Sequence, residues 1–107
     1  MKTPESLADL GRFSEPALLI LVSLAEGPKH GHAILLDIEA LTGQRLGPGT
    51  LYGAITRLEE RGWIQPLAAE DRRRPYKLTA AGRGVLRFRL ESLRKMARVG
   101  QARLADA

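Results

Sequence analysis

The chain has 107 residues, of which 44% are hydrophobic and 27% are charged, a composition typical of one small soluble globular domain. Lys and Arg number 17 against 12 acidic residues, for a formal net charge of +5, and such a basic surplus attracts polyanions. There is no cysteine, which excludes disulfides, thiolate metal sites and thiol nucleophiles.

The first predicted elements are a weak lead and a strongly apolar helix. Residues 1–13 are weakly amphipathic, with apolar side chains every three positions at Leu7, Leu10 and Phe13. A helix is predicted over 14–26, because Ser14 is a good N-cap and Pro16 is tolerated in a first turn. It is apolar nearly all round, which is typical of a helix at the centre of a core. Its apolar run, 17–25, is too short for a membrane span of about 20 residues, so we expect a cytoplasmic protein that does not enter a membrane.

Two further helices follow in the sequence. The second is predicted over 31–41, with one apolar stripe of Ile34, Leu35, Ile38 and Leu41, and Thr42-Gly43 ends it. The third is predicted over 48–61, with Leu51, Ile55 and Leu58 buried and with Gly62 as a left-handed C-cap.

A β-hairpin and a long helix complete the chain. Residues 63–65 and 75–78 have strand character, and the polar loop between them predicts a hairpin with a long, charged tip. Thr79 caps a final helix that runs from residue 80 to about 104. The order of elements therefore predicts a mainly α fold with a small β-hairpin wing.

The third helix combines a buried face with a row of small polar and basic residues. We expect that row to contact DNA through Pro48, Gly49, Thr50, Tyr52, Gly53, Thr56 and Arg57. Thr and Tyr hydroxyls bond phosphate oxygens, and Arg bonds phosphate or the edge of guanine. A helix N-terminus also favours a phosphate. The alternative is an ordinary solvated helix face.

The hairpin tip carries three adjacent arginines, Arg72, Arg73 and Arg74, with Lys77 on the returning strand. Adjacent cations repel one another unless an anion neutralises them, so we expect these four residues to bind DNA phosphates. The alternative is a solvated loop whose charge is partly offset by the neighbouring acidic residues.

The start of the second helix carries Lys29 and His30, which we also expect to contact phosphate. His30 and His32 do not predict a metal site, since residues two apart do not face one another on a helix.

The last helix carries a seam with alternating steps of four and three: Leu86, Leu90, Leu93, Ala97, Gly100 and Leu104. A second stripe lies beside it at Val85, Phe88, Met96 and Val99. Two apolar stripes need two partners, so we expect one to pack on the domain and the other on a second chain. The predicted homodimer interface contains Leu7, Leu10, Leu86, Leu90, Leu93, Ala97 and Leu104. The alternative is one broad stripe that faces the chain's own core.

Three runs taken together resemble the PadR family of bacterial transcriptional regulators. They are Pro-Gly-Thr-Leu-Tyr at 48–52, Leu-Glu-Glu-Arg-Gly-Trp-Ile at 58–64 and Arg-Pro-Tyr-Lys-Leu-Thr-Ala-Ala-Gly at 74–82. The similarity covers roughly residues 17–95, and His30-Gly31 also matches. Departures are His32, where an aromatic residue is common, and Gly53, where proline is common. Close approach to the DNA backbone is one hypothesis for Gly53.

The resemblance implies a winged helix-turn-helix DNA-binding domain over 1–79 and a C-terminal dimerisation helix over 80–107. It implies a homodimer that binds double-stranded DNA at a palindromic operator and usually represses transcription. Thr50 and Tyr52 would contact DNA, and the arginine loop would be the wing. Some members bind planar aromatic effectors near the dimer interface, so a small aromatic or hydrophobic effector stays open, although this last helix offers only Phe88.

The sequence contains no nucleophile elbow, phosphate loop or His-Glu-x-x-His motif, so we expect neither an enzyme nor a cofactor or metal. Two rivals stay open beside the DNA-binding regulator. One is a winged-helix protein-interaction module without specific DNA binding. The other is an RNA-binding protein, which a comparison of duplex DNA with structured RNA would separate, since the A-form major groove is too narrow for a helix.

Overall fold

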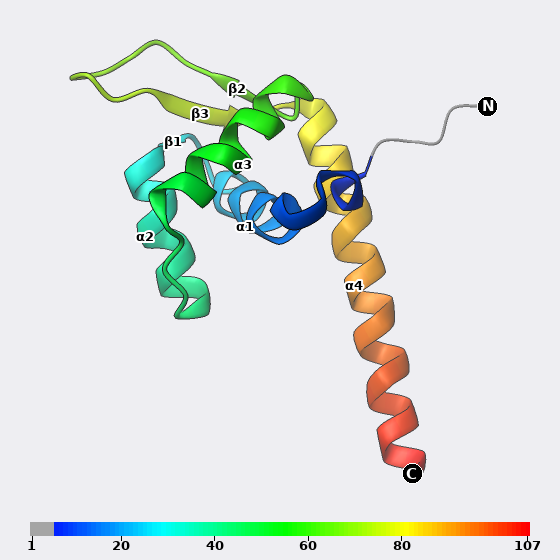
Figure 1. The fold of residues 1–107 in the computed structure, drawn as a ribbon. Helices are drawn as coiled ribbons and strands as arrows, with labels where there is room; N and C mark the ends of the chain where they lie inside the picture. Colours follow the sequence, from blue (N-terminus) through cyan, green and yellow to red (C-terminus); the bar gives the residue numbers. More distant parts are fainter. Residues whose placement is uncertain (1–5) are drawn as a thin grey trace.

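The computed structural model describes residues 6–107, so the first five residues of the predicted lead lie outside the described part. Figure 1 shows a helical body with a small sheet on one side and one long helix that projects from it. The elements in chain order are η1 (a 3-10 helix, Leu7–Phe13), α1 (Ser14–Leu24), β1 (Lys29–His30), α2 (Gly31–Thr42), α3 (Pro48–Glu60), β2 (Ile64–Pro66), β3 (Pro75–Leu78) and α4 (Ala80–Asp106). The predicted mainly α fold with a small β-wing is therefore confirmed.

Helix α1 runs through the centre of the body, as its apolar sequence predicts (Figure 1). Its Ala17, Ile20 and Leu21 have no exposed surface. Burying a side chain as large as that of Ile20 or Leu21 contributes about 1.5–3 kcal/mol. The buried residues of the other elements that form one cluster with α1 are Leu7, Leu10, Ile34, Leu35, Ile38, Leu51, Ala54, Ile55, Leu58, Trp63, Ile64, Leu78 and Leu86.

Three residues of the predicted dimer interface belong to this core. Leu7 and Leu10 of η1 and Leu86 of α4 are buried within the protomer. Their periodicity does reflect an apolar face, but that face is already covered by the chain's own helices. At most 8% of the surface of any of these three is exposed in the single chain, so they have little surface left to contact a second chain, and their predicted place in the dimer interface is not supported.

The sheet has three antiparallel strands in the order β1-β3-β2. Strands β2 and β3 are the predicted hairpin, with Ile64 opposite Leu78 and Pro66 opposite Tyr76. Strand β1 was not predicted; it has two residues and pairs Lys29 with Tyr76. A strand this short has no readable alternation, but it joins the start of α2 to the wing.

The wing, residues 64–78, has a paired tip where a long loop was expected. Glu70 and Arg73 form a β-bridge, with backbone hydrogen bonds of 2.6 and 2.8 Å. The two residues between them, Asp71 and Arg72, have φ of 47° and 69°. Positive φ at both central residues characterises the two-residue turn whose twist matches a β-hairpin, and Asn-Gly is its preferred sequence. Asp-Arg is a poor fit to that preference, which explains why the turn was not predicted.

Helix boundaries agree with the predictions to within a few residues, with two local differences. Ser14 is the first residue of α1, and Phe13 is its N-cap without a side-chain hydrogen bond, so the predicted Ser14 cap is wrong. Leu41 was assigned to the buried stripe of α2 but is 59% exposed, because α2 extends beyond the core there. Gly62 has the expected left-handed φ of 73°, and Thr79 Oγ1 accepts from the Gly82 amide at 3.0 Å, as a cap does.

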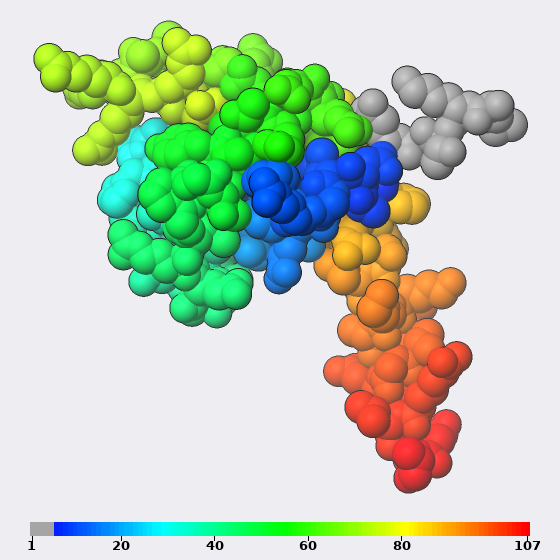
Figure 2. Space-filling model, in the orientation of Figure 1, coloured from blue at the N-terminus to red at the C-terminus, as the bar shows by residue number. Residues whose placement is uncertain are grey.

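Helix α4 packs on the body only near its start. Gly82 and Leu86 are its only buried residues, and the rest of the helix projects away from the body (Figure 2). The two predicted stripes are therefore not divided between the protomer and a partner. Instead, the first turns of α4 pack on the body, and the remaining turns are uncovered in the single chain. No helix within residues 6–107 combines the length and the apolarity that crossing a membrane requires.

Candidate nucleic-acid interface

The N-terminal end of α3 is open to solvent while its inner face is fixed in the core. Leu51, Ala54, Ile55 and Leu58 are buried, whereas Pro48, Gly49 and Thr50 are exposed. The Leu51 amide donates to the Gly47 carbonyl at 2.9 Å, so the amides of Gly49 and Thr50 precede the helical ladder. Gly47 has no side chain with which to cap them, and Pro48 has no amide hydrogen. Such a helix start presents free N–H groups and a positive dipole end to an anion.

Tyr52 lies across the start of α2. A Cβ placed on Gly31 would lie 2.5 Å from the Tyr52 hydroxyl and 2.9 Å from two of its ring carbons. Glycine is therefore required at position 31 for the ring to lie flat there. The Tyr52 side chain is still half exposed, so its hydroxyl is fixed by packing and remains accessible.

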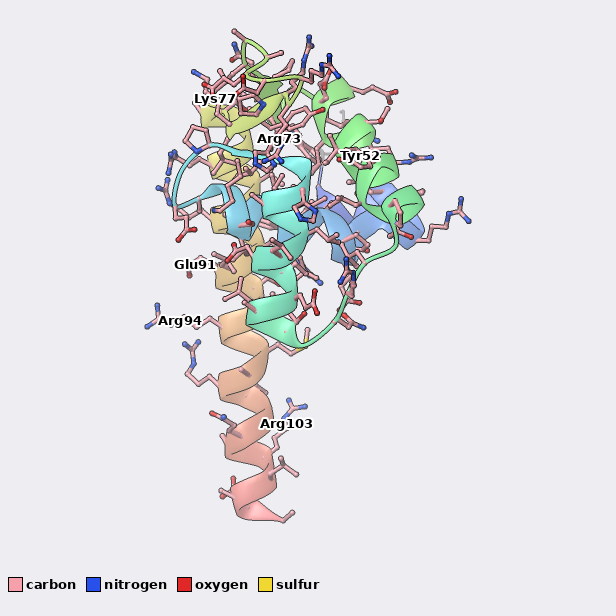
Figure 3. All side chains as sticks on the ribbon, turned by 90° about the vertical axis from the view of Figure 1, so that its left-hand side faces the viewer. Tyr52, Arg73, Lys77, Glu91, Arg94 and Arg103 are labelled. Atoms are coloured by element: carbon pink, nitrogen blue, oxygen red, sulfur yellow. The ribbon has the colours of Figure 1, made fainter. Side chains whose placement is uncertain are left out.

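A pocket of about 300 Å³ joins α2, α3 and the wing. Five of its residues belong to the set predicted to bind DNA: His30, Tyr52, Arg72, Arg73 and Arg74. Three more were not predicted: Gly31, His32 and Tyr76. These three residues could have been predicted only from strand β1, which places the start of α2 beside the wing. No sequence pattern revealed that strand. Tyr52, Arg73 and Lys77 lie at the end of the molecule opposite the tip of α4 (Figure 3).

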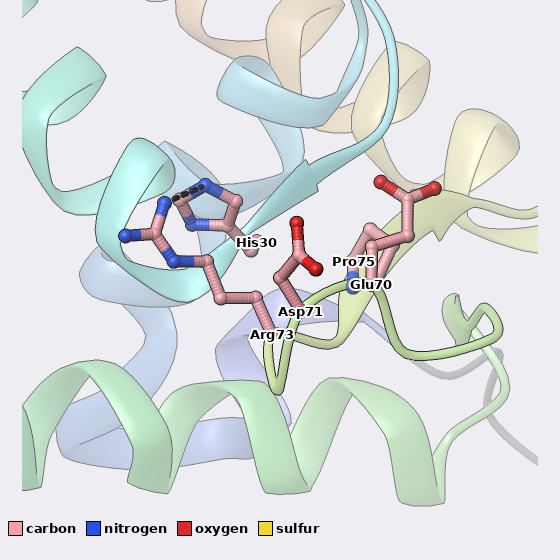
Figure 4. A pocket seen from close by; sticks show the side chains of 5 residues that line it. All are labelled: His30, Glu70, Asp71, Arg73 and Pro75. Carbon is pink, nitrogen blue, oxygen red and sulfur yellow. Dashed lines mark hydrogen bonds between the residues drawn. The ribbon is translucent and has the colours of Figure 1, made fainter.

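His30 connects α2 to the wing through its two ring nitrogens. Nδ1 accepts the capping hydrogen bond from the Ala33 amide at 3.3 Å, and Nε2 lies 3.4 Å from Arg73 Nη1 (Figure 4). A neutral imidazole has one donor and one acceptor nitrogen, and a guanidinium has only donors. When Nδ1 accepts from the Ala33 amide, Nε2 carries the ring hydrogen and faces the Arg73 donor, whereas in the other tautomer Nε2 accepts from Arg73.

A second pocket, of about 420 Å³, lies on the other side of the same contact. His30, Glu70, Asp71, Arg73 and Pro75 line it, and Figure 4 shows the Asp71 and Glu70 carboxylates on the side of the imidazole away from the Arg73 guanidinium. Two acidic groups line this pocket, whereas the pocket beside α3 is lined by the two tyrosines and all three wing arginines and, within residues 6–107, by no acidic residue. The pocket beside α3 therefore suits an anion better.

Tyr76 forms the floor of the interface from strand β3. Burial raises the pKa of the Tyr76 hydroxyl, and the negative charge of Glu59 raises it further. The hydroxyl therefore keeps its hydrogen at neutral pH and remains a donor. Strand alternation turns the exposed Lys77 to the opposite face, so this predicted residue lies outside the pocket.

Lys29 does not reach the interface, contrary to prediction. Its ammonium donates to the Ser23 carbonyl and pairs with Glu26 at 2.8 Å and with Asp37 at 3.8 Å. The Asp37 carboxylate also accepts a 2.6 Å hydrogen bond from the buried Ser23 hydroxyl. The Lys29 side chain is only 15% exposed, so it ties β1 to α1 and α2.

Arg57 and Gly53 also have internal partners. The Arg57 guanidinium lies 3.8 Å from the centre of the Phe13 ring and donates to the Gly53 carbonyl at 2.9 Å. A Cβ on Gly53 would lie 2.9 Å from Phe13 Cε1. Arg57 is therefore directed at η1 in the free protein, and its predicted role as a DNA contact is not supported by this geometry. Gly53 has a packing reason that does not involve DNA.

The outward face of α3 changes character along its length. Thr56 is exposed and its hydroxyl donates to the Tyr52 carbonyl at 2.9 Å, which leaves the oxygen able to accept a bond. Glu59 and Glu60 follow and are exposed. Carboxylates repel phosphates, so the surface that suits a polyanion is confined to the first two turns of α3 and the wing.

Comparison with known proteins supports the same interpretation. Residues 20–88 match the family model described as the transcriptional regulator PadR-like family. The chain is 43% identical over 96 residues to an uncharacterized 37.1 kDa protein in transposon Tn4556 of Streptomyces fradiae, covering 89% of this chain but only 28% of that relative's length.

Two solved structures extend the likeness to the whole fold. A transcriptional regulator from Clostridium thermocellum superposes with a TM-score of 0.73 at 28% identity, covering 88% of this chain and 96% of the other. A PadR family transcriptional regulator from Eggerthella lenta gives a TM-score of 0.68 at 27% identity, covering 94% and 88%. The family match spans well over half of the sequence, so this chain belongs to the PadR-like family of transcriptional regulators.

Proposed function

We propose that this regulator binds duplex DNA with the first two turns of α3 in the major groove and with the wing arginines on the flanking phosphates. The observation that carries the proposal is the shared pocket at the junction of α2, α3 and the wing. It gathers Tyr52 and Arg72–Arg74 around the His30–Arg73 contact. In the tautomer in which Nδ1 of His30 caps α2, the imidazole and the arginines can only donate, and the Tyr52 hydroxyl is the one group in this set that can also accept.

A phosphate supplies acceptors for these donors. With Nδ1 of His30 engaged at the Ala33 amide, the Nε2–H and the Arg73 guanidinium can both donate to one phosphate oxygen. Charge-assisted hydrogen bonds of this kind are about twice as strong as neutral ones. The exposed Thr50 and the amides at the start of α3 would then lie over the groove beside that strand.

We infer a homodimer from the uncovered part of α4. Phe88 is 72% exposed and Leu104 is 77% exposed, and Leu90 and Met96 are also exposed. A single helix that projects apolar side chains into water is stabilised by covering them with another copy. Leu90, Leu93, Ala97 and Leu104 remain the proposed contacts. A two-fold dimer would hold its α3 helices about 34 Å apart, and so favour a palindromic operator.

Repression is part of the same proposal, since a dimer across a promoter blocks polymerase from the same DNA. A small aromatic or hydrophobic effector would act where Phe88 meets the second copy, and its binding would change the spacing of the two α3 helices. A cytoplasmic location follows from a role on DNA.

The test begins with selection of bound fragments from random duplex DNA, followed by affinity measurements with variants. Thr50→Ala combined with Tyr52→Phe should abolish preference for the selected sequence, because both groups that reach the groove are lost while the Tyr52 ring keeps its packing on Gly31. Each good side-chain contact to DNA is worth about 1–3 kcal/mol. Gln101→Ala, on the exposed end of α4, is the matched control and should bind as the wild type does.

The same experiment separates the rival functions. No enrichment of any sequence would favour the protein-interaction module, and preference for structured RNA over the duplex would favour an RNA-binding protein. For the dimer, Leu90→Asp should give monomers in sedimentation and weaken operator binding. A Leu90→Asp protein that still sediments as a dimer would remove the proposed α4 contact.

A further inference from the structure

We propose that Phe13 is a positioning residue for DNA binding, which fixes the orientation of α3 from its outer side by seating its ring in the gap left by Gly53. The inference rests on the proposed role of α3 in reading DNA. It goes beyond that role because Phe13 lies on η1 and is assigned no DNA contact.

The Phe13 ring is held between α3 and two guanidinium groups. A Cβ on Gly53 would lie 2.9 Å from Phe13 Cε1 and 3.3 Å from Cζ, so the ring occupies the place where any other residue would put its side chain. Arg57 covers the ring at 3.8 Å, and Arg12 lies 4.9 Å from its centre. Cations over an aromatic face within about 6 Å are attracted by it.

The contact between η1 and α3 continues along one row of the helix. Gly53, Arg57 and Arg61 are spaced by four residues and therefore lie above one another. Phe13 contacts the first two, and Asp9 lies 4.0 Å from Arg61. Leu7 and Leu10 anchor η1 in the core between these contacts. The row is thus tied to a segment whose own apolar side chains are fixed.

Among the contacts given for residues 6–107, η1 restrains α3 outside its buried face along this row. The core holds α3 from beneath through Leu51, Ala54, Ile55 and Leu58. A helix that is held along one face can still rotate about its axis. Such a rotation leaves the axis in place but displaces the tip of a side chain that contacts a DNA base. A second line of contact on the η1 side opposes that rotation.

A double-mutant cycle on the full chain tests the assignment. Phe13→Ala should lower affinity for the selected operator roughly ten-fold, which is the loss expected when one good base contact is misplaced. The slope of affinity against salt should stay unchanged, because no phosphate contact is removed. Gly53→Ala should weaken operator binding in the wild type, since its Cβ displaces the ring. In the Phe13→Ala background, where the space is empty, Gly53→Ala should cost nothing further.

Amide exchange of the DNA-free variants gives a readout that does not depend on DNA. Phe13→Ala should speed exchange in α3 more than in α2, because the loosening is local. Gly84→Ala, on an exposed face with no atom within 4 Å of the new Cβ, is the matched control and should leave affinity unchanged and should not speed exchange in α3.

Two results would overturn the assignment. One is operator affinity and α3 exchange that both stay at wild-type values in Phe13→Ala. The other is an equal loss from Gly53→Ala with and without Phe13, which would mean that DNA and not the ring requires the glycine. If the wild type selects no duplex sequence, the proposed function fails, while the exchange comparison still decides whether Phe13 restrains α3.

Discussion

Gly82→Ala is predicted to destabilise the protein although it places alanine in a helix. A Cβ at position 82 would lie 2.0 Å from the Trp63 carbonyl oxygen and 2.9 Å from Leu78 Cδ1. The oxygen is part of the backbone, so α4 and β2 must separate by about 1 Å to reach even a tight contact. Thr79 holds this junction with an amide hydrogen bond to Trp63 O at 3.1 Å and a hydroxyl bond to Gly62 O at 2.7 Å.

The expected magnitude follows from those two bonds. Each contributes about 1 kcal/mol net, and more is lost if a buried carbonyl is left without a partner. The helix preference of alanine over glycine returns at most about 1 kcal/mol. A net loss of at least about 1 kcal/mol should lower the melting temperature by at least roughly 4–8 °C, at about 4–8 °C per kcal/mol for a domain of this size.

Thermal unfolding at matched protein concentration measures the effect, with Gly84→Ala as the control two residues further along α4. Position 84 is exposed with no atom within 4 Å of a new Cβ, so alanine there should raise the stability by up to about 1 kcal/mol. The two variants should therefore move in opposite directions. A Gly82→Ala protein at least as stable as the wild type would refute the close packing of α4 on the Trp63 backbone.

Three further predictions concern the wing and its supports. Arg72→Gly should slow amide exchange at the wing tip, because the left-handed φ of 69° costs a non-glycine residue about 1–2 kcal/mol. The same variant should reduce the salt slope of DNA binding by about 0.9, and an unchanged slope would show that Arg72 contacts no phosphate. Lys29→Met should lower the free energy of unfolding by about 2 kcal/mol, because the charged hydrogen bonds of Lys29 are lost. The slope of DNA affinity against salt should not change, and a reduced slope would show that Lys29 does contact DNA. The folded state holds the Tyr76 proton more tightly than the unfolded chain does, so this contribution to the free energy of unfolding is complete below about pH 10 and is lost as the pH rises through the raised pKa. Denaturation curves at increasing pH should show this loss in the wild type and not in Tyr76→Phe, and identical curves would contradict it.

Elements with a strong local signature were predictable from the sequence. The all-apolar α1 and the amphipathic α3 follow from hydrophobic periodicity, and Thr79 and Gly62 follow from capping preferences. The two-residue β1 has no such signature, and without it neither His32 nor Tyr76 could be assigned to the interface.

The other differences between prediction and structure arise from interaction partners that lie on distant parts of the sequence. Lys29 and Arg57 look like DNA contacts in sequence because their charge is visible there, whereas the carboxylates of Glu26 and Asp37 and the ring of Phe13 that engage them lie on other elements. The spacing of Leu7, Leu10 and Leu86 reports an apolar face correctly, but spacing does not say whether the face meets the same chain or another.

The central claim, that the N-terminal turns of α3 face the DNA groove, is tested most directly by site-specific photo-crosslinking. A benzophenone side chain would replace Thr50 in one variant and Gln101 of α4 in the other, each bound to the selected duplex. If these turns enter the groove, position 50 should crosslink to operator bases, excess unlabelled operator should suppress those crosslinks, and position 101 should give none. Equal crosslinking from both positions, or from position 101 alone, would contradict it.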